Sequence, residues 1–139
     1  MDCIFCAIVQ GRAPAHVVFE DEATMAFMDI NPVNPGHILV VPKAHARNIY
    51  DLDEEAAAAV MRTTVRVARA IKAALQPDGM NLLQSNERAA SQVVFHFHMH
   101  IVPRWRGDGL FIPRHPKPQA RGNIQDTADR IRAQLARGD

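Results

Sequence analysis

The chain has 139 residues, which is enough for one domain and few for two. Its 16 basic and 15 acidic residues leave a net charge of +1, so the charge gives no reason to expect a nucleic-acid-binding groove. No segment reaches the roughly 20 apolar residues of a membrane span, and the N-terminus lacks the pattern of a signal peptide. We expect a soluble, cytoplasmic protein with no membrane or nucleic-acid partner.

The first forty residues predict a short helix and then three strands. Residues 3–11 (CIFCAIVQG) are typical of a short helix that ends at a glycine. Residues 16–20 and 23–30 predict a hairpin of two strands, and residues 37–42 predict a third. The loop between them, residues 31–36, is fixed by two prolines and a glycine.

A long helix should follow, with Asp53 as its N-cap and a stop at residues 76–79 (QPDG). The residues of its inner face recur at helical spacing and are Val60, Thr64, Val67, Ile71 and Leu75. Residues 80–86 and 93–103 predict a fourth and a fifth strand, joined by a polar turn at residues 87–91.

Residues beyond 106 are irregular until Asn123, which is placed to cap a final helix with the inner face Ile124, Ala128, Ile131 and Leu135. The whole pattern is α+β: a five-stranded antiparallel meander with the long helix packed on its apolar face. We expect a single domain over residues 1–139, with a core at 1–106 and an irregular proline-rich tail plus C-terminal helix at 107–139.

The stretch HFHMHIV, residues 96–102, holds three histidines at two-residue spacing. In a strand, His96, His98 and His100 share one face. The other face then carries an apolar stripe of Phe95, Phe97, Met99 and Ile101.

Three uses of such clustered imidazoles compete. They are a three-histidine metal site with an open position, covalent catalysis by one neutral ring, and a polar sheet face without chemistry. Three histidines in register favour one of the first two.

Cys3 and Cys6 have the C-x-x-C spacing that suits two thiolate ligands of zinc, and histidines could supply the other two. The alternative is a redox pair, although that motif normally follows a strand in a βαβ setting. If one triad histidine binds zinc, a catalytic metal held by all three becomes less attractive.

Two longer motifs, PGHILVVPKAH (35–45) and QVVFHFHMHIVPR (92–104), carry a resemblance. Together with CIFCAIVQG and FEDEATMAFMDINPVNPGH they resemble, in order, the landmarks of the histidine triad (HIT) family of nucleotide hydrolases and transferases, in its HINT-like and bacterial branch. The likeness covers most of the chain.

The resemblance implies a catalytic set on the histidine motif. His98 is then the nucleophile that attacks the α-phosphorus of a nucleotide and forms a nucleotidyl-histidine, which water hydrolyses to a nucleoside monophosphate. His100 binds phosphate oxygens, and His37 stands beside the triad as a further polar partner. His96, the first triad histidine, belongs to the same motif.

The resemblance also implies the substrate-binding residues. Asp29 matches the carboxylate that accepts both ribose hydroxyls, with a turn initiator as its alternative, and Asn86 matches the amide near the phosphate or leaving group. Ser91 stands before Gln92 where close relatives usually carry glycine, and it could donate a hydrogen bond there. The apolar slot for the base corresponds to Ile4, Phe5, Ile8, Phe27 and Ile30.

A structural zinc site is implied as well, at Cys3, Cys6, His45 and His96, with no organic cofactor. A homodimer that joins the two sheets is expected. The implied activity is cleavage of purine nucleoside 5′-phosphoramidates and related conjugates. The alternatives are a dinucleoside polyphosphate hydrolase, a nucleotide-binding interaction module with weak catalysis, and a three-histidine metal hydrolase.

Overall fold

The computed structural model describes residues 3–110 and 123–138, so the predicted irregular stretch at 113–122 lies outside the described residues. The strands are β1 (Val17–Glu20), β2 (Thr24–Met28), β3 (Ile38–Pro42), β4 (Gly79–Leu83) and β5 (Met99–Arg104). The helices are α1 (Ile4–Val9), α2 (Glu54–Leu75), the short 3-10 helix η1 (Arg88–Ala90) and α3 (Ile124–Gly138). The predicted α+β class with a five-stranded antiparallel sheet is confirmed.

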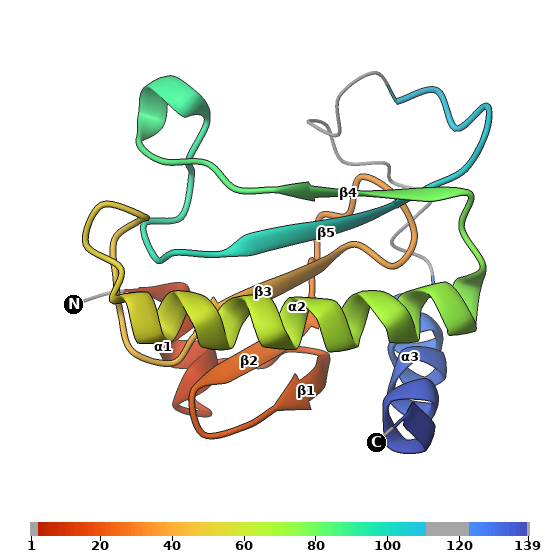
Figure 1. Cartoon of the computed structure of the whole chain (residues 1–139), viewed down its shortest axis with the longest axis horizontal. Helices are drawn as coiled ribbons and strands as arrows, with labels where there is room; N and C mark the ends of the chain where they lie inside the picture. The colour runs from red at the N-terminus through yellow and green to blue at the C-terminus, as the bar shows by residue number, and fades with distance from the viewer. Residues whose placement is uncertain (1–2, 111–122, 139) are drawn as a thin grey trace.

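The strand order departs from the predicted meander at one point. The order is β1-β2-β3-β5-β4, so β5 lies between β3 and β4 (Figure 1). The apolar β5 thereby gains two neighbours, whereas β4, which carries the exposed Leu82, is left at the edge. Leu39 of β3 and Leu83 of β4 are both Cα partners of His100, which places that histidine between two strands.

The two long helices cover one face of the sheet. α2 lies over the sheet, roughly along the direction of its strands, and contacts α3, which also packs against β1 (Figure 1). The core on this face joins the predicted inner positions of both helices to alternate residues of β2, β3 and β5. The members from the helices include Val60, Val67, Ile71, Ile124, Ala128, Ile131 and Leu135. Asp53 takes the predicted N-cap position of α2, although its side chain makes no capping hydrogen bond.

The opposite face of the sheet is covered by α1. Phe5 packs there with a second core that comes from β2 and β3, consisting of Met25, Phe27, Leu39 and Val41. Strands β2 and β3 are therefore buried on both faces. His100 shares this face, because its β3 partner Leu39 belongs to the second core.

Gly36 brings the loop before β3 against the end of α2. Its φ is +84°, and a Cβ at this position would lie 2.5 Å from the Leu75 side chain. Only glycine meets both conditions at low cost. This close approach fixes where His37, the next residue, enters the sheet.

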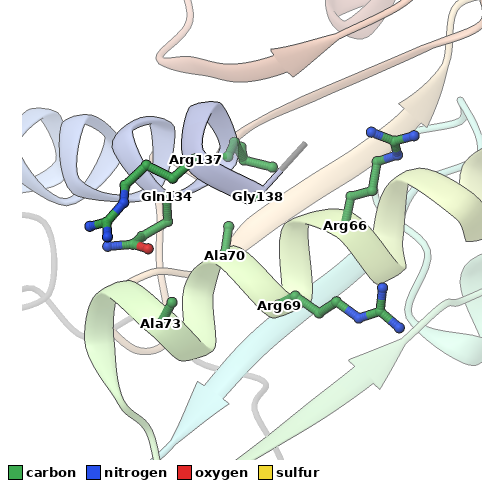
Figure 2. A pocket seen from close by; sticks show the side chains of 8 residues that line it. Arg66, Arg69, Ala70, Ala73, Gln134, Arg137 and Gly138 are labelled. Atoms are coloured by element: carbon green, nitrogen blue, oxygen red, sulfur yellow. The ribbon is translucent and has the colours of Figure 1, made fainter.

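A cleft of about 610 Å³ lies between α2 and α3 (Figure 2). Arg66 and Arg69 point away from Arg137, so the three guanidinium groups do not converge (Figure 2). None of its lining residues is among the predicted site residues. Among residues 3–110 and 123–138, no helix has both the length and the apolar composition needed to cross a membrane.

Candidate functional site

The three motif histidines lie at the start of β5 and in the bend before it. His96 is fully buried, His98 is 9% exposed, and His100 is half-buried. The rings of His98 and His100 are 4.9 Å apart between centroids, and the Phe5 ring stands edge-on to His98 at 5.1 Å. The sequence spacing thus brings two imidazoles into contact beneath α1.

The prediction of a strand over residues 93–103 is wrong for its first half, because β5 begins only at Met99. Two hydrogen bonds outside the sheet take the place of the ladder before Met99. The Gln92 side chain donates to the carbonyl of Val94, and the Phe97 N–H donates to the carbonyl of Ala46. Phe95 consequently leaves the predicted apolar stripe and lies under the Arg47 guanidinium, 4.3 Å from it.

One hydrogen bond fixes the tautomer of His98. Its Nδ1 lies 2.7 Å from the backbone oxygen of His96. A carbonyl oxygen only accepts, so Nδ1 carries the hydrogen and Nε2 keeps a free lone pair. This is the tautomer that an attacking imidazole requires.

A second chain of hydrogen bonds fixes His37 and His100. The Val33 N–H donates to Nδ1 of His37 at 3.2 Å, which places the His37 hydrogen on Nε2. That Nε2 lies 2.9 Å from Nδ1 of His100 and donates to it. His100 therefore carries its own hydrogen on Nε2, and it can donate this hydrogen to an oxyanion.

Burial keeps these rings neutral. Desolvation lowers the pKa of His98, and it lowers the pKa of His37 against the opposing charge of Asp29. Desolvation, with repulsion from His98 and His37 added, lowers the pKa of His100 to about 3. At neutral pH, His98 has a lone pair for attack and His100 is a neutral donor.

Asp29 completes this cluster and approaches the same His37 nitrogen, Nε2, that contacts His100. Its Oδ2 lies 3.4 Å from Nε2 of His37, while its Oδ1 accepts the N–H of Asn31. The bond to Asn31 is one that a turn-initiating aspartate makes. Each carboxylate oxygen can still accept further hydrogen bonds.

Cys3, Cys6, His45 and His96 converge on one point, with their ligating atoms all within 4.8 Å of one another. The separations are 3.4 Å from Cys3 Sγ to His96 Nδ1, 3.4 Å from Cys6 Sγ to His45 Nδ1, and 3.2 Å between the two Nδ1 atoms. A tetrahedral zinc ion with bonds of about 2.0–2.3 Å holds its ligands at roughly these spacings. His96 donates from Nε2 to the carbonyl of Pro42, 2.8 Å away, so its Nδ1 faces the cluster unprotonated. The donor set fits zinc.

Asp29, His37 and His100 form a second group with closely spaced ligating atoms. The Val33 N–H argues against a metal there, because it occupies Nδ1 of His37 and keeps a hydrogen on the Nε2 that would have to bind the ion. In the described residues, the metal-ligating groups of three or more split the triad, with His96 in one group and His100 in the other. The three-histidine metal site is accordingly disfavoured.

The residues of the predicted base slot divide into buried and exposed members. Phe5 and Phe27 are buried and pack edge-on at 5.3 Å, and Ile8 lies partly buried against the same core. Ile4 and Ile30 are 51% and 61% exposed. Phe5, Phe27 and Ile8 thus share one apolar cluster under α1.

The loop between β4 and β5 carries the other predicted contacts. Asn86 is half-buried and accepts the Ile49 N–H on its Oδ1. Gln92 is buried, and its amide donates to the carbonyls of Arg47 and Val94 while accepting from Glu87, so it braces the loop. Ser91 has φ +74° and ψ 25°, a left-handed conformation that favours glycine.

The strongest support of this loop comes from residues outside the predicted site. Glu87 holds φ 73° and ψ 162°, a conformation essentially restricted to glycine that costs about 1–3 kcal/mol in other residues. Arg47 binds its carboxylate with two nitrogens at 2.8 and 3.0 Å, and the buried Asn48 donates to it at 2.6 Å. These contacts lower the pKa of Glu87 to about 2. In the sequence Asn48 and Glu87 are ordinary loop residues, with no signal that they meet.

Comparison with known proteins decides the family. The HIT domain family matches residues 10–107. The chain belongs to the HIT family.

Two solved HIT structures and one curated relative illustrate the likeness. The protein hit of Bacillus subtilis (strain 168) is 46% identical over 110 residues, which cover 78% of this chain and 76% of that protein. A Zn-bound histidine triad family protein from Mycobacterium smegmatis has a TM-score of 0.89 at 39% identity, covering 100% of this chain and 96% of its own. A hypothetical histidine triad nucleotide-binding protein from Sulfolobus tokodaii strain7 has a TM-score of 0.84 at 35% identity, covering 97% and 93%.

Proposed function

We propose that this HIT protein is a phosphoramidase: it hydrolyses purine nucleoside 5′-phosphoramidates and related nucleotidyl conjugates at the α-phosphorus, through a nucleotidyl-histidine on His98. The observation that carries the proposal is the bond from His98 Nδ1 to the His96 carbonyl, which leaves Nε2 free to attack. A similar HIT structure named a nucleotide-binding protein supports the ligand class.

The two steps of the proposed reaction balance as follows. Nε2 of His98 gives its lone pair to the α-phosphorus, and the bond from phosphorus to the leaving amine breaks while the amine takes up a proton. Water then attacks the same phosphorus, gives up a proton and breaks the bond to His98, releasing the nucleoside monophosphate. His100, with its hydrogen held on Nε2 by His37, donates to the phosphoryl oxygens in both steps.

The remaining predicted residues bind the substrate in this proposal. The carboxylate of Asp29, whose Oδ2 lies beside His37, accepts hydrogen bonds from the ribose hydroxyls. The base enters the apolar slot formed by Ile4, Phe5, Ile8, Phe27 and Ile30. Asn86 and Ser91 face the phosphate or leaving group, and Gln92 keeps their loop in place.

We also propose that Cys3, Cys6, His45 and His96 hold a structural zinc ion, as their donor set and spacing support. A bound zinc ion would supply a cross-link between the N-terminal helix and the sheet. His96 is both a ligand of this site and the acceptor for His98, and Phe5 lies between the two cysteines and contacts the His98 ring. The zinc site thus supports the reacting ring from two sides.

The proposed assembly is a homodimer that joins the two sheets. β4 is an edge strand, and Leu82 on it is 42% exposed, so a second copy can pair along it. Leu82→Lys should convert the protein to a monomer in sedimentation velocity. A dimer that persists in this variant places the interface elsewhere.

Turnover of an AMP-amine conjugate and of diadenosine tetraphosphate tests the activity. We expect the wild-type protein to release AMP from the conjugate, and His98→Ala to lose at least about a thousandfold in kcat with its fold and metal content retained. His16→Ala is the matched control, because the His16 side chain is hydrogen-bonded to Gln125 of α3 and is not among the proposed site residues.

Each other outcome has a defined meaning. A preference for diadenosine tetraphosphate assigns the protein to dinucleoside polyphosphate hydrolysis. Equal activity in His98→Ala and wild type would rule out His98 as the nucleophile. Tight AMP binding without turnover by the wild type supports a nucleotide-binding module instead.

A further inference from the structure

The side-chain amide of Asn86 is held from two directions. The Ile49 N–H donates to its Oδ1 at 2.8 Å. Gln84 donates from Nε2 to the same oxygen at 2.8 Å and accepts from Asn86 Nδ2 on its own Oε1 at 2.7 Å. Gln84 and Asn86 thus form a paired amide contact beside the loop that follows Asn48.

Two backbone groups define the orientation of both amides. The Ile49 N–H can only donate, so the atom of Asn86 that faces it is the oxygen. The Ser85 carbonyl can only accept, so the atom of Gln84 that faces it at 3.1 Å is the nitrogen. With either amide flipped, two donors or two acceptors would meet, so each side chain has one consistent orientation.

This orientation leaves Asn86 able to act toward a ligand only as a hydrogen-bond donor. Its oxygen is used twice and one of its two amide hydrogens is taken by Gln84. Among the described residues, no hydrogen bond occupies the second hydrogen of this half-buried side chain. Asn86 can therefore offer an N–H and has little capacity left to accept.

The pair lies at the edge of the reacting centre. Leu83 is the Cα partner of His100, so Gln84 is the first residue after the strand position beside that histidine. The loop between β4 and β5 ends near Gln92, whose side-chain amide donates to the carbonyl of Val94, two residues before His96. The strained Glu87 lies between these ends, held by Arg47 and Asn48. A strained loop fixed by this many contacts next to a site is typical of preorganisation.

We propose that Gln84 is a positioning residue for the reaction: it fixes the Asn86 amide so that its free N–H points at the phosphoryl oxygens or the leaving group. The inference rests on the proposed hydrolysis at His98. Gln84 itself touches no substrate, and it acts through Asn86.

A double-mutant cycle tests this role in the intact protein with the AMP-amine conjugate. Gln84→Met keeps the length of the side chain and removes both amide contacts, and Asn86→Ala removes the donor. We expect Gln84→Met to lose about tenfold in kcat/KM, mostly in kcat, because the donor is misaligned as charge develops on the phosphoryl oxygens. In the Asn86→Ala background the Gln84→Met substitution should have no further effect.

Two further variants separate positioning from folding. Gln134→Met makes the same change at a half-buried glutamine of α3 outside the site, and it should retain wild-type kinetics. Gln84→Glu still accepts from Asn86 Nδ2 but loses the donations to Asn86 Oδ1 and to the Ser85 carbonyl, so it should fall between wild type and Gln84→Met. If Gln84→Met fails to fold, Gln84→Glu carries the same cycle.

The outcomes are distinct. Wild-type kinetics in Gln84→Met, or losses that simply add in the double variant, overturn the positioning role while leaving the proposed function intact. If the wild-type protein turns over neither substrate, the proposed function fails. The cycle is then measured on AMP binding, where equal affinity of Gln84→Met and wild type overturns the inference as well.

Discussion

Two clusters of potential metal-ligating side chains stand on the same face of the sheet. In each cluster, a hydrogen bond to one backbone group decides which histidine nitrogen carries the hydrogen. At the Cys3, Cys6, His45 and His96 cluster, the Pro42 carbonyl takes the hydrogen of His96 Nε2 and leaves Nδ1 free for a metal. At the second cluster, of Asp29, His37 and His100, the Val33 N–H occupies His37 Nδ1 and forces a hydrogen onto Nε2.

The comparison teaches that similar spacing of imidazoles does not imply similar use. A backbone acceptor turns a histidine into a ligand, and a backbone donor turns it into a hydrogen-bond donor toward its neighbour. His98 follows the first pattern, with the His96 carbonyl as its acceptor, and this is why its own free nitrogen can react. In the proposed mechanism, the motif therefore supplies a metal ligand, a nucleophile and a hydrogen-bond donor within five residues.

Of the two clusters, the one formed by Asp29, His37 and His100 should give the larger loss of activity. His100→Asn removes the N–H directed at the phosphoryl oxygens, and kcat on the AMP-amine conjugate should fall by about 10²–10³-fold. The metal content should stay at that of the wild type, because His100 is not in the cysteine cluster. Loss of zinc together with activity in this variant would mean that the two clusters are not separate.

Substitutions in the cluster of Cys3, Cys6, His45 and His96 should instead change zinc content and stability. Cys6→Ser should abolish zinc binding and lower the free energy of unfolding by about 2.7 kcal/mol under conditions where free zinc stands at 100 times its Kd. His37→Asn, in the other cluster, should keep one zinc per chain in elemental analysis. Two zinc ions per wild-type chain, reduced to one by His37→Asn, would show that the Val33 N–H does not prevent metal binding.

The strand positions, helices and core were predictable from the sequence because they follow from periodicity. The inner face of α2, from Val60 to Leu75, and that of α3, from Ile124 to Leu135, were read from apolar spacing alone. The start of β5 was not, because three side-chain and backbone contacts of Gln92, Phe97 and His98 compete with the ladder before Met99. Periodicity carries no information about such contacts.

The candidate site was predictable only in part. The spacing of His96, His98 and His100 indicated chemistry by itself, whereas His37 and His45 came from the family resemblance because they lie far away in sequence. Gln84 and Asn48 were missed. Their roles depend on which backbone groups they meet after folding, and no local pattern encodes that.

The smallest effect expected is on the pH dependence of stability. The pKa of His100 is about 3 in the folded protein and about 6.5 in an unfolded chain, so the unfolded state binds one more proton between these values. Stability should consequently fall as the pH drops below about 6.5. His100→Asn lacks this contribution, and its free energy of unfolding should fall less steeply, by about 1 kcal/mol per pH unit, in urea titrations between pH 6 and 4.5. Parallel curves would place His100 in a more solvated environment than the structure gives it.

The most direct test of the central claim is to trap the nucleotidyl-histidine. Wild-type protein is mixed with the AMP-amine conjugate, quenched in alkali during a single turnover, digested, and analysed by mass spectrometry. We expect an adduct of one AMP less water on His98 that is absent from His98→Ala. The adduct should accumulate if attack by water is the slower of the two steps. AMP release with no adduct on His98, or with an adduct on another residue, would contradict the claim.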